Sequence, residues 1–116
     1  TLLEFTDDQL AEVNKTYPLW SRYIIPGGTY PNLHTDTQTI AHPNILAVRS
    51  DIPEEAVYMI TKTVFENLAA LREIHKATRE VTLEKALTGL SAPLHPGAIR
   101  YYREKGLSIP VNLLPQ

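Results

Sequence analysis

The chain has 116 residues, of which 11 are Lys or Arg and 13 are Asp or Glu, so its formal net charge is −2 at pH 7. That length suits one small domain, and the near balance of charge gives no electrostatic reason to bind nucleic acid or an anionic membrane surface. The absence of cysteine excludes disulfides, Cys-zinc sites, iron–sulfur clusters and thiol catalysis. No apolar run approaches the roughly 20 residues that a membrane-spanning helix needs.

A helix of about ten residues is predicted after Phe5. The residues from Thr6 to Gln9 are typical of a capping box, in which the Thr6 side chain accepts a hydrogen bond from an otherwise unpaired backbone amide and the Gln9 side chain reaches back to the start of the helix. Asp7 and Asp8 place negative charge near the positive end of the helix dipole. Pro18 is expected to end this helix within a residue or two.

Two strands are predicted next, separated by a loop. Leu19 to Ile25 is rich in aromatic and β-branched residues, as strands are, and Pro26-Gly27-Gly28 stops it. The segment from Pro26 to Thr37 is rich in turn formers and has no period, which indicates an ordered loop. Gln38 to Ala41 is the second strand.

A third strand is predicted over Ile45 to Val48, because the run is continuously apolar and therefore expected to be buried on both faces. A long helix is predicted from Asp51 to His75, with Asp51 as its cap and Pro53 in its first turn. Its apolar residues recur every three or four positions and should pack against the Ile45 to Val48 strand. These residues are Val57, Ile60, Val64, Leu68 and Leu71.

Two further helices and an extended tail complete the chain. Thr82 is expected to cap a short helix that Gly89 ends, and Pro96 to open another that stops at Gly106. This order of elements predicts a mixed α and β fold with few strands. Two or three strands make a poor sheet, because an apolar strand needs neighbouring strands on both of its edges. The missing neighbouring strands must therefore come from an absent lobe or from a second copy of the chain. The chain is therefore expected to self-associate.

The stretch Gly27-Gly28-Thr29-Tyr30-Pro31 is the best candidate for a binding site. Its glycines allow close backbone approach and would expose amides that hold a carboxylate, while Thr29 and Tyr30 add orienting groups. The alternative interpretation is a tight turn in which Tyr30 packs for stability.

A metal site is the second candidate, formed by His34, Asp36 and His42, since two His and one carboxylate are a ligand set for iron or zinc. Their spacing matches no established pattern, and no Ser-His-Asp order, HExxH or GxSxG occurs. The stretch from Tyr101 to Lys105 has the pattern of an amphipathic helix with a solvated charged face. Nothing in the sequence requires an enzyme or a cofactor.

Three segments carry a resemblance to a known family. They are Ile25-Pro26-Gly27-Gly28-Thr29-Tyr30-Pro31; Thr39-Ile40-Ala41-His42-Pro43-Asn44 running into Val48-Arg49-Ser50-Asp51-Ile52-Pro53-Glu54; and Leu94-His95-Pro96-Gly97-Ala98 with Tyr101-Tyr102-Arg103-Glu104-Lys105-Gly106. In this order they resemble the extracytoplasmic solute receptors of TRAP transporters, specifically the TAXI family. That family commonly has Gly where Asn32 follows Pro31 here.

The resemblance implies a periplasmic, non-enzymatic binding protein of the two-lobe type II kind. It would capture a small organic solute, a carboxylate or an amino acid, and deliver it to a TRAP membrane permease without a cofactor. The ligand-binding residues would be Gly28, Thr29, Tyr30, Pro31 and Thr39.

The resemblance also implies that the 116 residues are one C-terminal portion of a longer receptor. Residues 1–48 would be the end of the second lobe with the strand that crosses the hinge, and residues 49–116 the C-terminal helices. The start at Thr1, without an initiator Met, agrees with a fragment. Two other readings stay open, namely a small metal-dependent enzyme using His34, Asp36 and His42, and a structural oligomerisation domain.

Overall fold

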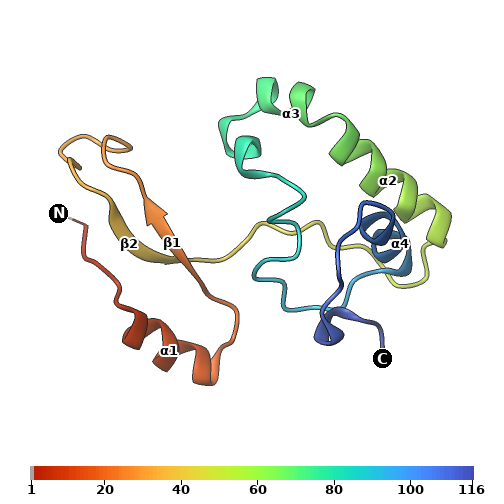
Figure 1. Cartoon of the computed structure of the whole chain (residues 1–116), viewed down its shortest axis with the longest axis horizontal. Coiled ribbons are helices and arrows are strands. Elements are labelled where there is room, and N and C mark those ends of the chain that lie inside the picture. The colour runs from red at the N-terminus through yellow and green to blue at the C-terminus, as the bar shows by residue number, and fades with distance from the viewer. Residues whose placement is uncertain (1) are drawn as a thin grey trace. The chain divides into compact units, whose positions relative to one another are not determined.

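The computed structural model describes residues 2–116, which form two compact units that meet in sequence between Asn44 and Ile45. Across these residues there are four α-helices, two short 3-10 helices and one two-stranded antiparallel sheet (Figure 1). The fold is therefore mixed α and β, as predicted. Within residues 2–116 no helix has the length and apolar character needed to cross a membrane.

The first unit begins with helix α1 (Asp7–Thr16), whose predicted capping box is confirmed in both halves. The Gln9 amide donates to the Thr6 hydroxyl at 3.2 Å, and the Thr6 amide donates to the Gln9 side-chain oxygen at 2.9 Å. The helix ends at Thr16, two residues before Pro18, because proline restricts the backbone of the residue that precedes it.

A β-hairpin follows α1 and forms the rest of the first unit. Strand β1 (Ser21–Ile25) pairs antiparallel with β2 (Thr37–Ala41), with Ser21 opposite Ala41 and Ile25 opposite Thr37. The backbone of Phe5 bonds to Gln38, since the Phe5 amide donates to the Gln38 carbonyl at 3.0 Å. The loop of residues 26–36 closes the hairpin at the Ile25 end (Figure 1).

The predicted strand over residues 45–48 is wrong, because this segment has no regular structure and is exposed. Leu46 has 73% of its surface in solvent. An apolar run indicates that a segment tends to be buried, but a strand also needs a neighbour for its backbone hydrogen bonds. Within the described residues no strand pairs with residues 45–48.

The second unit contains α2 (Glu54–Glu66) and α3 (Leu68–Ile74), where the sequence predicted one continuous helix. The break falls at Asn67, whose amide donates to the Val64 carbonyl at 3.3 Å while its side chain donates to the Thr63 carbonyl at 2.8 Å. The predicted cap is also wrong. Pro53 occupies the N-cap position, and Asp51 instead pairs with Arg49.

Helix α4 (Pro96–Glu104) packs against α2, and the two lie side by side in Figure 1. The predicted packing of the long helix on residues 45–48 is therefore wrong. Tyr58 from α2 and Tyr101 and Tyr102 from α4 form the buried core. Phe65 adds its ring, stacked on Tyr101 with centroids 5.9 Å apart. The charged face predicted for α4 points outward, with Arg103 and Glu104 exposed.

The ends of α4 match the sequence signals closely. The His95 side chain caps the helix by accepting from the Gly97 amide at 3.2 Å, and Gly106 follows the last turn at a φ of 84°. The predicted helix from Thr82 to Gly89 is wrong: consecutive turns replace it, although Thr82 still accepts from the Lys85 amide. The Ala86 amide donates to the Leu83 carbonyl and the Thr88 amide to the Lys85 carbonyl. Each of these bonds reaches three residues back, as in turns, whereas an α-helix needs bonds that reach four residues back.

The tail after Gly106 folds onto its own unit. It contains the short 3-10 helix η2 (Val111–Leu113), in which Leu113 is only 2% exposed. The Leu94 amide donates to the Leu113 carbonyl at 2.8 Å, which holds the tail beside the segment that leads into α4. An exchange of this tail between two copies of the chain would have to break this packing.

Candidate functional site

The loop of residues 26–36 contains four of the five residues that the resemblance implied would bind ligand. Gly27 is required by close approach, because a Cβ there would lie 2.9 Å from the His34 carbonyl oxygen. Gly28 is required by its backbone, which has a φ of 85° with open space around it. The two adjacent glycines therefore serve two different physical needs.

Hydrogen bonds within the loop hold it in one shape. The Gly27 amide donates to the Asp36 carboxylate at 2.9 Å, the Gly28 amide to the Leu33 carbonyl at 2.6 Å, and the Thr29 amide to the Pro26 carbonyl at 3.2 Å. The glycine amides were expected to be open to a ligand carboxylate. That expectation is wrong, because both amides already have partners inside the loop.

The side chains of Thr29 and Tyr30 are the groups that the loop presents to solvent. The Thr29 hydroxyl donates to the Pro26 carbonyl at 2.7 Å, which leaves its oxygen lone pairs available to accept. Tyr30 is 55% exposed, so the alternative in which it packs for stability is not what the structure shows. Pro31 beside it is also exposed.

Asn32 has a φ of 66°, and it is the one residue other than glycine with a positive φ among residues 2–116. Asn tolerates this left-handed conformation better than other residues because its short polar side chain bonds locally. The backbone at this position therefore favours Gly or Asn.

Thr39 lies away from the loop, in the middle of β2 opposite Tyr23. It lies two positions along β2 from Thr37, which belongs to the last pair of the hairpin, or roughly 7 Å away along the strand. It is half-buried, whereas Thr29 and Tyr30 are exposed. The structure thus brings Gly28, Thr29, Tyr30 and Pro31 together and leaves Thr39 on the sheet.

The metal alternative finds no ligand set in the part of the chain that the structure describes. Asp36 is engaged with the Gly27 amide, and the His42 ring packs edge-on against Trp20 with centroids 6.1 Å apart. His42 follows the end of β2 that is remote from the loop. Among residues 2–116 no three His, Asp or Glu side chains are grouped so that they could hold a metal ion.

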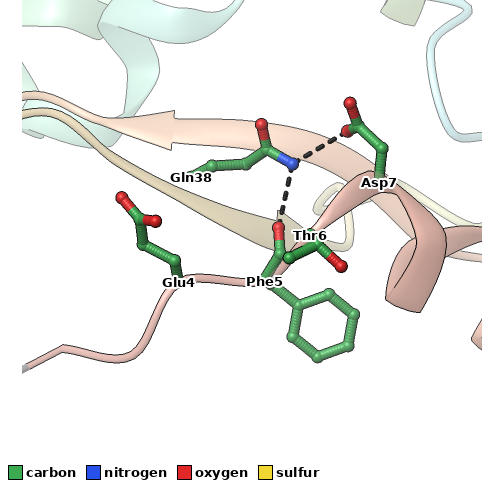
Figure 2. A pocket seen from close by; sticks show the side chains of 5 residues that line it. All are labelled: Glu4, Phe5, Thr6, Asp7 and Gln38. Carbon is green, nitrogen blue, oxygen red and sulfur yellow. Dashed lines mark hydrogen bonds between the residues drawn. The ribbon is translucent and has the colours of Figure 1, made fainter.

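A hollow of about 300 Å³ lies beside β2 in the first unit, and sequence reasoning did not indicate it. Figure 2 shows the Gln38 side chain turned toward Phe5 and Asp7, which line it with Glu4 and Thr6. The Gln38 amide nitrogen donates to the Phe5 carbonyl and to the Asp7 carboxylate, both at 2.8 Å. Both donated bonds of Gln38 are therefore made to groups of the same unit, and the charged side chains that line the hollow are the carboxylates of Glu4 and Asp7. We assign these contacts a structural role.

Several of the pKa shifts in the second unit arise where α2 meets α4. The Tyr58 hydroxyl donates to the Glu104 carboxylate at 2.6 Å, which lowers the pKa of Glu104 and raises that of Tyr58. The Arg100 guanidinium lies 4.0 Å from the centre of the Tyr58 ring and bonds to Glu55 at 2.7 Å, which raises the pKa of Arg100. These groups join α2 to α4.

Comparison with known protein families gives a match over residues 1–106, to the NMT1-like family. The chain belongs to the NMT1-like family. This is a family of the periplasmic substrate-binding type, whose members bind a ligand and are typically extracytoplasmic. The NMT1-like match includes the 26–36 loop as well as α2 and α4, and it ends at Gly106, directly after α4.

Proposed function

We propose that this NMT1-like chain is the C-terminal part of an extracytoplasmic solute receptor that serves a TRAP-type transporter, within the TAXI group. The residues of the two most specific segments support this. The Leu94–Gly106 segment holds the fold, since His95 caps α4 and Gly97 lets α4 approach α2. In the Gly27–Pro31 segment, by contrast, the side chains of Thr29, Tyr30 and Pro31 are exposed, which leaves them available for a ligand.

The exposed Tyr30 on an internally bonded loop is the observation that carries the proposal. A large amphipathic ring costs free energy in water unless something covers it, and the loop fixes where it stands. The proposed ligand is a small organic carboxylate or amino acid, which would contact Gly28, Thr29, Tyr30 and Pro31, with Thr39 as the more distant candidate. Because the Gly27 and Gly28 amides are occupied, hydroxyls and the aromatic ring are the groups offered to it.

The exposed segment of residues 45–48 supports the proposed division of the receptor. Residues 1–48 would be the end of the second lobe and the strand that crosses the hinge, and residues 49–116 the C-terminal helices. An apolar extended segment gains burial and backbone pairing when it enters a sheet of the other lobe. Ligand capture would then proceed by hinge closure, driven by a higher affinity of the closed form.

The test compares two exposed tyrosines of the first unit in the protein as its gene encodes it. Tyr30→Ala is expected to weaken the binding of small dicarboxylates or amino acids, followed by calorimetry, at least tenfold with an unchanged melting temperature. Tyr17→Ala is the matched control, since Tyr17 is 62% exposed and lies outside the loop. Equal affinities for the two variants would contradict the assignment of the loop.

The 116-residue chain on its own is expected to bind the same solutes no more tightly than millimolar, because a two-lobe site is incomplete without its other wall. We also propose that it self-associates through residues 45–48, since unpaired extended segments are templates for another chain. Sedimentation equilibrium at micromolar concentration distinguishes a dimer from a single 13.1 kDa species. Micromolar solute affinity of this chain alone would contradict the lobe division.

A further inference from the structure

The end of α3 and the 3-10 helix η1 (Lys76–Glu80) border an open hollow of about 670 Å³ in the second unit. We refer to the residues that line it as the basic patch. They are Arg72, Glu73, Ile74, His75, Lys76 and Arg79. With His75 neutral, three cations and one carboxylate give this patch a net charge of +2, whereas the whole chain carries −2.

The cations of the basic patch differ from most others in the chain because they have no ion-pair partner within residues 2–116. Six of the eight cations elsewhere are paired at 4.0 Å or less, and only Lys62 and Arg103 among the described residues outside the patch are not. The pairs are Lys15 with Glu12, Arg22 with Asp7, Arg49 with Asp51, Lys85 with Glu80, Arg100 with Glu54 and Glu55, and Lys105 with Glu66. Glu80, the carboxylate that follows Arg79, is already engaged by Lys85. The positive charges of Arg72, Lys76 and Arg79 are therefore not neutralised by an ion pair within the described residues.

An apolar side chain stands among these cations. Ile74, the last residue of α3, is 77% exposed, and it lines the same hollow as Arg72 and Lys76. The helix dipole accounts for a cation in the last turn of α3, which is Arg72, but it gives no reason for an exposed isoleucine. The charge and the exposed aliphatic group of this hollow are complementary to a ligand that carries carboxylates and an apolar side chain.

We propose that the basic patch docks an acidic segment of a partner protein, with its carboxylates on Arg72, Lys76 and Arg79 and one apolar side chain against Ile74. Arginine suits this role because its planar guanidinium binds a carboxylate through two parallel hydrogen bonds. A membrane surface is the less suitable occupant, since it favours a helix with a broad apolar face, and the patch offers a single aliphatic side chain in a concave site. This surface belongs to the second unit, whereas the proposed solute loop belongs to the first.

The test measures binding of a fluorescein-labelled twelve-residue peptide, in which Glu and Asp flank one Leu, to the 116-residue chain by anisotropy. Arg72→Glu and Arg79→Glu are each expected to weaken binding at least fivefold, and raising the salt concentration should weaken it further. Arg103→Glu is the matched control: Arg103 is exposed, carries no ion pair in the described chain, makes the same charge change and lies outside the patch. It should leave the affinity within twofold.

Ile74→Ser tests the apolar half of the surface. It should weaken binding of the Leu peptide and leave unchanged that of a peptide with Ser in place of Leu. Equal losses from Arg103→Glu and Arg72→Glu would show nonspecific electrostatics and overturn the proposal. Capture by phosphatidylserine vesicles that depends on Arg72 and Arg79, with no binding of the peptide, would also overturn it in favour of a membrane surface.

Discussion

A Cβ atom placed on Gly97 would lie 2.3 Å from the carbonyl oxygen of Glu54. The N-terminal turns of α2 and α4 meet at this point without an intervening side chain, which lets the tyrosine core close behind them. The relationship gives Gly97 a packing role that its place in a helix alone would not require.

Gly97→Ala is therefore expected to destabilise the second unit by about 3 kcal/mol, since the new methyl group overlaps backbone that cannot move aside. Helix propensity alone would change stability in the opposite direction by up to about 1 kcal/mol, so the sign is diagnostic. Gly106→Ala is the control, with open space around it but a φ of 84°, and should cost about 1 kcal/mol. Urea unfolding followed by tyrosine circular dichroism measures both, and a smaller loss for Gly97→Ala would refute the clash.

The hydrogen bond from Tyr58 to Glu104 predicts a dependence of stability on pH. It lowers the pKa of Glu104 in the folded state. The stabilisation is thus present above the ordinary pKa of a glutamate, about 4.3, and is lost as the pH falls through the lower folded value. Tyr58→Phe should return the pKa of Glu104 toward its ordinary value, which carbon NMR of the carboxyl group measures.

Tyr17→Phe is the control for that titration, because Tyr17 is exposed and lies in the other unit. It should leave the Glu104 titration unchanged. The same shift in both variants, or none in Tyr58→Phe, would assign the lowered pKa to another cause.

Gln38 is expected to stabilise the first unit through three hydrogen bonds, which join β2 to Phe5, to Asp7 and to the Arg22 side chain on β1. Gln38→Met keeps the side-chain volume and removes all three, which should cost about 1–2 kcal/mol. Gln38→Glu should cost no less at neutral pH, since it loses both donated bonds and adds charge beside Asp7. Trp20, the one tryptophan, reports the unfolding by fluorescence. A Met variant as stable as the native chain would show that these bonds contribute nothing.

Asn32→Ala should destabilise the first unit by about 1 kcal/mol, because alanine at a φ of 66° has the same Cβ strain but lacks the short polar side chain that makes this conformation acceptable for Asn. Asn32→Gly should cost nothing or stabilise slightly. The exposed Asn44 supplies the control, whose change to Ala is expected to stay within about 0.5 kcal/mol. The same fluorescence measurement applies, and equal effects of the Ala and Gly variants would contradict the left-handed backbone.

Local sequence signals predicted the parts of the fold that local bonds determine. Thr6 with Gln9, His95 before Pro96, and Gly106 after Lys105 are each satisfied by a partner within five residues, so the sequence contains the whole interaction. The two strands were predictable for a related reason, since strand-forming residues stand on both sides of a loop rich in turn formers. Their antiparallel pairing was not predicted. The position of the candidate loop followed from the same pattern.

Errors arose where the outcome depends on distant residues. Residues 45–48 form no strand because nothing in the described chain pairs with them, and the helix predicted from Asp51 to His75 breaks at Asn67 while its first part packs on α4. In the loop, the bonds from Gly27 to Asp36 and from Gly28 to Leu33 occupy the amides that the sequence offered to a ligand. Sequence alone determined which residues tend to be buried, capped or turned. Only the tertiary structure decided which groups find partners across the chain, because a hydrogen bond needs both members at one place in space.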